Sequence, residues 1–198
     1  MGKTELCYKI IQHKDTLFKT PVNKTVLVYS KWQPLYDKIR KFDPRVIFIQ
    51  GYPENLTELH VSDPNYHDLV IVDDKSDLSN SSSFMSEFTV NSHHMRFSIC
   101  FLVHSIYFPS KFMKTIQLSA TGFFLFKSMR DLNMIQNLAR QIEPNKVKYK
   151  KIMNWYRIAT SKPYGYLFVN LSVKCPEILR FRSDIFQNFG PMETFIMK

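Results

Sequence analysis

The chain has 198 residues, of which 44% are hydrophobic and 22% are charged. This length suffices for one domain with a buried core, and the composition excludes a disordered or fibrous protein. Its 27 Lys and Arg residues against 17 Asp and Glu give a formal net charge of +10, which favours a polyanionic partner such as nucleic acid.

Short runs rich in Val, Ile and Phe alternate along the chain with more polar segments of helical spacing. This alternation is typical of an α/β protein built around a parallel sheet. We expect strands at residues 25–29, 46–50, 68–72, 97–103, 121–126 and 166–171. Helices are expected at 5–13, 33–41, 83–91, 110–117, 130–141 and 146–156. The expected organisation is one domain over residues 1–186, followed by a short tail at 187–198.

The chain begins Met1-Gly2-Lys3-Thr4 and continues directly into a segment of helical spacing. Gly2, Lys3 and Thr4 match the last three positions of the phosphate-loop pattern Gly-x-x-x-x-Gly-Lys-Ser/Thr. Four earlier positions of the pattern and the strand that normally precedes it have no counterpart in the sequence. An accidental Gly-Lys-Thr start is therefore the alternative interpretation.

The apolar strand expected at 68–72 ends in two acids, Asp73 and Asp74. A buried strand followed by two carboxylates is the Walker B pattern of nucleotide hydrolases. In that pattern Asp73 would hold Mg²⁺ and Asp74 would polarise the attacking water. The alternative is a buried strand that ends in a solvated acidic turn.

A series of segments, taken in chain order, carries a resemblance to a known family. They are Tyr29-Ser30-Lys31-Trp32-Gln33-Pro34-Leu35-Tyr36, the strand end at Asp73-Asp74, Ser92-His93-His94, Phe126-Lys127-Ser128-Met129-Arg130-Asp131, Leu138-Ala139-Arg140-Gln141 with Pro144, Tyr164-Gly165-Tyr166-Leu167, and Leu179-Arg180-Phe181-Arg182 with Ile185-Phe186. In this order they resemble the FtsK/HerA-type P-loop ATPases that package DNA in double-jelly-roll viruses and in the related Maverick/Polinton transposons. The resemblance covers residues 26–186.

The resemblance implies a RecA-like core of the ASCE class, an α/β three-layer sandwich with a mainly parallel sheet. The first strand and most of the phosphate loop are expected to be missing. ATP and Mg²⁺ are the implied cofactors, with Gly2, Lys3 and Thr4 at the nucleotide and Thr4 and Asp73 at the metal. The implied catalytic residues are Asp74 and an arginine, Arg130 or Arg140, that reaches in from a neighbouring subunit, a role that suits a permanently charged guanidinium.

The implied partners are double-stranded DNA, further copies of the chain in a ring, and capsid proteins. The implied locations are the host nucleus or cytoplasm and the virion. For each arginine taken singly, a cap or salt bridge within the expected helix at 130–141 is the alternative role.

The sequence departs from the family pattern at several positions. Where such ATPases show a polar sensor of Thr-Gln-Asn type after the strand, this chain has His104, which we expect to contact the terminal phosphate. Lys75 and Ser76 replace an apolar pair after the second acid, so a cation is expected beside the two carboxylates. These departures, with the short phosphate loop, leave open a catalytically inactive remnant that binds DNA or a partner subunit.

A basic run contains Lys146, Lys148, Lys150 and Lys151. We expect these lysines to face a DNA backbone, where they would contact phosphates without reading sequence. A solvated helix face is the alternative.

Cys7, Cys100 and Cys175 are widely spaced and form no Cys-x-x-Cys pair. We therefore expect reduced thiols in an intracellular protein, without a disulfide framework or a zinc site. No apolar run approaches the roughly 20 residues that span a bilayer, and the start lacks the pattern of a secretory signal. The prediction is a soluble protein with no membrane partner.

Overall fold

The computed structural model describes residues 2–53, 56, 65–186 and 193–197. These residues form an α/β protein that groups into two compact units, Lys3–Ser119 and Ala120–Lys198, with Gly2 assigned to the second. The helices are α1 (Lys3–Gln12), α2 (Lys14–Leu17), α3 (Pro34–Phe42), α4 (Ser82–Ser86), α5 (Ser92–His94), α6 (Met113–Ser119), α7 (Leu132–Ile142) and α8 (Lys146–Ala159). The strands are β1 (Val22–Tyr29), β2 (Ile47–Gln50), β3 (His67–Asp73), β4 (Phe97–Leu102), β5 (Gly122–Phe126), β6 (Tyr166–Asn170), β7 (Phe181–Arg182) and β8 (Thr194–Phe195). Single turns are η2 (Ser76–Asn80), η3 (Glu87–Asn91) and η4 (Glu177–Leu179).

The first unit contains a four-stranded sheet of order β2-β1-β3-β4 in which every neighbouring pair is parallel. Its central strands are apolar on both faces: Val26, Leu27, Val28 and Leu69 to Val72 are nearly inaccessible to solvent. A strand buried on both faces needs helices on both sides of the sheet. The apolar runs of the sequence, separated by polar segments of helical spacing, predicted this central part of the fold, and the structure confirms it.

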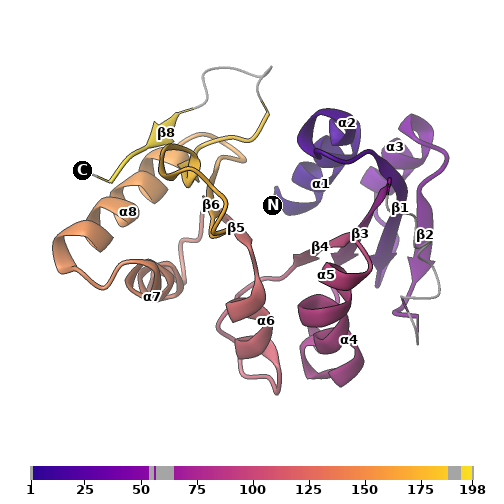
Figure 1. Cartoon of the computed structure of the whole chain (residues 1–198), viewed down its shortest axis with the longest axis horizontal. Coiled ribbons are helices and arrows are strands. Elements are labelled where there is room, and N and C mark those ends of the chain that lie inside the picture. Colours follow the sequence, from indigo (N-terminus) through magenta and orange to yellow (C-terminus); the bar gives the residue numbers. More distant parts are fainter. Residues whose placement is uncertain (1, 54–55, 57–64, 187–192, 198) are drawn as a thin grey trace. The chain divides into compact units, whose positions relative to one another are not determined.

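Helices cover both faces of the parallel sheet. On one face Val26, Val28, Val70 and Val72 form a core with Phe84 of α4 and Ile116 of α6. α1 and α3 contact each other, and their apolar side chains are buried, Ile10 and Ile11 from α1 and Tyr36 and Ile39 from α3. Figure 1 shows α1 and α3 on the side of the sheet opposite α4.

The expected helix at 83–91 forms within one helical stretch, in which a π-helical turn lies between α4 and α5. α4 ends at Ser86 and the chain continues as a π-type turn from Glu87 to Asn91. Glu87 is buried, and its carboxylate accepts hydrogen bonds from the Leu56 amide, at 3.0 Å, and from the Tyr52 hydroxyl. Because a buried carboxylate must be satisfied by donors, we attribute the wider turn to the placement of Glu87.

The second unit holds an antiparallel sheet of order β5-β6-β7-β8 (Figure 1). The strands expected at 121–126 and 166–171 do form, but they pair with each other in this second sheet and not in the parallel one. α7 and α8 pack together, and the Tyr156 hydroxyl of α8 donates to the Phe126 carbonyl at 3.0 Å. Of the expected tail, residues 187–192 lie outside the described residues, and Thr194–Phe195 pairs with β7 as β8.

Candidate functional site

The carboxyl ends of three parallel strands meet at one edge of the first sheet. Tyr29 at the end of β1 is paired in register with Asp73 of β3, and Asp73 is paired with Leu102 of β4. The residues that follow these strands, Ser30, Asp74 and His104, therefore lie along the same edge. Such an edge is the usual place for ligand binding in open parallel sheets.

Asp73 is the buried centre of this edge, with only 5% of its surface exposed. Its Oδ2 atom accepts a hydrogen bond from the Thr4 hydroxyl at 3.0 Å and another from the Tyr36 hydroxyl at 2.9 Å. Thr4 comes from the first turn of α1 and Tyr36 from α3. Two donors from two helices bind one carboxylate oxygen, so they hold the Asp73 side chain in one orientation.

Tyr36 has a hydroxyl that stays protonated. Burial, reinforced by the nearby Asp73 carboxylate, raises the pKa of Tyr36 far above its ordinary value. The hydroxyl is therefore a permanent donor to Asp73. No spacing rule indicated this contact, although Tyr36 lies in one of the segments that carry the family resemblance.

Lys3 reaches the end of the neighbouring strand. Its ammonium donates to the Val103 carbonyl at 3.0 Å and lies 3.3 Å from Nδ1 of His104. Burial lowers the pKa of Lys3, whereas Asp73 and Asp74 act in the opposite direction by favouring the charged form. The result is a partly desolvated cation beside two carboxylates.

His104 connects Lys3 to Asp74. Its Nε2 atom lies 3.5 Å from Oδ1 of Asp74, and its side chain is 83% exposed. One neutral tautomer suits both contacts: Nδ1 accepts from the Lys3 ammonium and the Nε2 proton points to Asp74. The sequence assigned His104 to this edge, and the structure brings it there.

Asp74 adopts a left-handed backbone conformation with φ of 55°. The Ser30 hydroxyl donates to its carbonyl at 2.7 Å, which ties the turn after β3 to the end of β1. Left-handed conformations are unfavourable for most side chains but are tolerated by Asp and Asn. The turn leaves the Asp74 carboxylate exposed, in contrast to the buried Asp73.

Lys75 was expected beside the two acids as a neutralising cation. In the structure its ammonium pairs with Asp77 at 3.1 Å. The cation that contacts His104 and lies near Asp73 and Asp74 is instead Lys3. The order of residues along the chain suggested Lys75, but the turn after β3 directs its ammonium to the carboxylate of Asp77.

The residues at this edge are suitable for a small hard cation together with a phosphate. Within the described part of the chain, no three His, Cys, Asp or Glu side chains gather as in a metal centre made by protein alone. Mg²⁺ is commonly held by one or two carboxylates, a hydroxyl and phosphate oxygens, with water completing its shell. Asp73 and Thr4 provide the carboxylate and hydroxyl of such a set, and Lys3 provides a cation for phosphate. Gly2 immediately precedes α1.

The two candidate arginines belong to the second unit. Arg130 is exposed in the bend before α7, because α7 begins at Leu132 with Asp131 as its N-cap. Arg140 lies in the last turn of α7, and its guanidinium is 5.1 Å from the centre of the Tyr149 ring. Both arginines are exposed to solvent, and the Arg140 guanidinium is in addition in contact with Tyr149 of α8.

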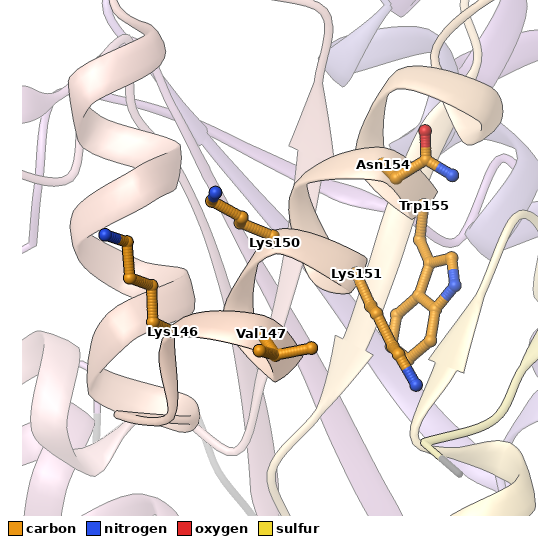
Figure 2. Close-up of a pocket in the computed structure, with 6 residues that line it drawn as sticks. All are labelled: Lys146, Val147, Lys150, Lys151, Asn154 and Trp155. Atoms are coloured by element: carbon orange, nitrogen blue, oxygen red, sulfur yellow. The ribbon is translucent and has the colours of Figure 1, made fainter.

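Three of the four candidate lysines line a hollow of about 510 Å³ along α8. The residues around it are Lys146, Val147, Lys150, Lys151, Asn154 and Trp155, and Figure 2 shows their side chains on this part of the helix. We call this surface the α8 groove. Lys148 is the exception, since its ammonium lies 3.8 Å from the Glu143 carboxylate.

Comparisons with protein-family models, with curated proteins and with solved structures find no match for this chain. No helix within residues 2–53, 56, 65–186 and 193–197 is long and apolar enough to cross a bilayer.

Proposed function

We propose that the chain is an ATPase domain of the P-loop class that couples ATP hydrolysis to movement of double-stranded viral or transposon DNA. The observation that carries the proposal is the hydrogen bond between Thr4 and Asp73, with Lys3 beside them. Thr4 and Asp73 are far apart in the sequence, and they are the residues that would share Mg²⁺ in a phosphate-loop enzyme.

In this proposal each residue of the edge has one task. Lys3 binds the terminal phosphates of ATP, exchanging its contacts with Val103 and His104 for phosphate oxygens. Thr4 and Asp73 hold Mg²⁺, which, when bound, offsets the negative charge that develops on the phosphates. Gly2 contributes its backbone N–H to the phosphates.

Asp74 and His104 act on the attacking water. The exposed Asp74 carboxylate accepts a hydrogen bond from the water and aligns it with the terminal phosphate. His104 approaches Asp74 through Nε2 and the Lys3 ammonium through Nδ1. It therefore senses the terminal phosphate through the position of Lys3.

Assembly and DNA binding involve residues outside this edge. Copies of the chain form a ring, in which an arginine from a neighbour completes the nucleotide site. Both arginines are exposed, and Arg130 is the better candidate because the Arg140 guanidinium is engaged with the Tyr149 ring. The α8 groove contacts the phosphates of DNA, and capsid proteins are further partners.

The second candidate function is a catalytically inactive relative of these ATPases that binds DNA or a partner subunit. The observation that favours it is the α8 groove, whose lysines belong to the second unit. These lysines are positively charged whether or not a nucleotide is bound. Under this alternative, DNA binding would survive the loss of Lys3 or Asp74.

The test is ATP affinity in the presence of Mg²⁺, followed by DNA-stimulated phosphate release, for the wild type, Lys3→Ala and Asp74→Asn. We expect Lys3→Ala to weaken ATP binding at least about tenfold, equivalent to about 1.4 kcal/mol. Asp74→Asn keeps the left-handed turn and ATP binding but lowers phosphate release by about 100-fold.

The controls are Lys38→Ala and Asp77→Asn, which change charges of the same sign at exposed positions outside the edge. Equal losses of ATP affinity or phosphate release in the controls would overturn the proposal of an enzyme. The absence of ATP binding by the wild type at millimolar ATP would do the same, and either result would leave the DNA-binding alternative.

A further inference from the structure

Two cysteines that are far apart in the sequence meet inside the first unit. Sγ of Cys7 lies 3.9 Å from Sγ of Cys100, although 93 positions separate them in the chain. Cys7 belongs to α1 and Cys100 to β4. Cys175 belongs to the second unit, where its thiol donates to the Pro176 carbonyl at 3.5 Å.

The two thiols differ in their access to solvent. Cys7 has 1% of its surface exposed, whereas Cys100 is only partly buried. In the sheet, β4 is an end strand whose described neighbour is β3. Because Cys100 is the more exposed of the two thiols, a small oxidant reaches it first, and the Cys7 sulfur is then within 3.9 Å of it.

We propose that Cys7 and Cys100 are an oxidation site that forms a reversible intramolecular disulfide in the folded chain. The oxidant is a low-molecular-weight disulfide of the glutathione type. The Cys100 thiolate attacks one sulfur of the oxidant, forming a mixed disulfide and releasing one small thiol. The Cys7 thiolate then attacks Sγ of Cys100 and releases the second small thiol. The two electrons lost by the protein thiols reduce the oxidant, and each protein thiol gives up one proton.

Little movement is needed for this reaction. A disulfide has an S–S distance of about 2.0 Å, so the two sulfur atoms must approach by roughly 2 Å. Both elements are held in place by other contacts, because Thr4 bonds to Asp73 and Lys3 bonds to the Val103 carbonyl. The fold therefore holds the two sulfur atoms close together before the reaction, and disulfide formation does not require a large movement of either element.

The chemistry also sets the order of the two steps. The hydrogen bond with Cys100 and burial raise the pKa of the Cys7 thiol well above its ordinary value. A protonated thiol is a poor nucleophile, so Cys7 reacts second, once Cys100 carries a leaving group. We expect the second step to be the slower one.

The bond would lock α1 onto the parallel sheet. Lys3 and Cys7 are separated by four positions in α1, so they lie on the same face of the helix. Lys3 already contacts the residues that follow β4, and the disulfide would add a covalent link one turn further along. This inference does not depend on nucleotide binding.

The experiment treats the folded full chain with oxidised glutathione and maps the products by mass spectrometry without reduction. We expect a Cys7–Cys100 linked peptide pair, reversal by dithiothreitol, and a rise in Tm on the order of 10 °C because a long loop is closed. Cys175→Ser should behave as the wild type does.

Two single variants separate the steps. Cys7→Ser should stop at a glutathione adduct on Cys100, and Cys100→Ser should leave Cys7 unmodified in the folded chain. Linkage only through Cys175, linkage only after unfolding in urea, or adducts on Cys7 in the folded Cys100→Ser variant would each overturn the proposal.

Discussion

Asp73 is held by two hydroxyl groups that donate to the same carboxylate oxygen. A buried carboxylate that loses one donor is left partly unsatisfied, which costs more than the hydrogen bond is worth in solution. Tyr36 contributes one of the two donors and is itself fully buried. Its hydroxyl therefore stabilises the first unit, independently of any role of the edge in catalysis.

A substitution by phenylalanine removes that hydroxyl alone. Tyr36→Phe should lower the free energy of unfolding by about 1 to 2 kcal/mol, since the ring remains and one buried hydrogen bond to a charged group is lost. Urea unfolding followed by circular dichroism measures the change. Tyr66→Phe, at an exposed position, is the matched control and should change the stability by less than about 0.5 kcal/mol. Equal effects would contradict the assigned contact.

A buried ion pair lies away from the strand edge. The Lys14 ammonium is 2.6 Å from Asp43, which also accepts hydrogen bonds from Arg45. Burial acts to raise the pKa of Asp43, but the hydrogen bonds from Arg45 and Lys14 prevail and lower it to about 2. Since the folded pKa lies below the ordinary value of 3.8, the charged form of Asp43 stabilises the fold.

The second prediction follows from the direction of that shift. The contribution of Asp43 is fully present above about pH 4 and is lost as the pH falls through about 2. Asp43→Asn should cost about 3 kcal/mol at neutral pH, because Lys14 stays buried without its partner. The difference between wild type and variant should shrink as urea titrations move from pH 6 towards pH 2.5. A difference that is constant over this range would contradict the pair.

At the scale of elements, α8 is the helix on which the second unit's proposed role depends. The Asn145 side chain caps its first turn by accepting from the amides of Val147, at 3.0 Å, and Lys148, at 3.2 Å. Lysines in the first turn oppose the helix dipole, so this end has little stabilisation besides the cap. Of the lysines that line the α8 groove, Lys146 and Lys150 lie on one face because they are about one turn apart, and Lys151 lies beside Lys150 in the next position.

The third prediction concerns this cap. Asn145→Ala should lower the free energy of unfolding by about 1 kcal/mol, because two backbone donors lose their acceptor. Asn145→Asp keeps the acceptor and adds a charge that suits both the helix dipole and the neighbouring lysines, so it should equal or exceed the wild type. Thermal unfolding of the three proteins decides this, and a similar loss in both variants would exclude capping as the cause.

At the scale of the whole molecule, the net charge of +10 favours DNA over neutral partners but does not say where DNA binds. The structure gathers three lysines around the α8 groove and leaves Lys148 beside Glu143. Binding through phosphates depends on salt, because each neutralised phosphate releases condensed counterions. The salt dependence therefore reports how many lysines make contact.

The fourth prediction uses that dependence. Replacing Lys146, Lys150 and Lys151 together by Gln should weaken binding to duplex DNA of any sequence. The slope of log K against log salt should become shallower by about 2 to 3. The control replaces the exposed Lys19, Lys38 and Lys41 of the first unit, which removes the same charge. If both sets reduce the slope equally, DNA binding follows net charge and the groove has no special role.

The sequence by itself determined the α/β class and the positions of the central strands, because those depend on local patterns of apolar residues. It also indicated that Asp74 and His104 lie at one edge of the sheet, because each follows a parallel strand and such strands end together. The short match at Gly2, Lys3 and Thr4 indicated a partner for Asp73, and the structure places Thr4 in contact with it.

Only the tertiary structure decided which distant side chains touch. It paired Tyr36 with Asp73, Cys7 with Cys100 and Lys75 with Asp77, and it placed β5 and β6 in a separate antiparallel sheet. These contacts depend on the register of strands and on the faces that helices bury, so they follow from packing of the whole chain. A pattern within one segment determines that segment's own structure, but it does not specify which residues from distant segments will contact it.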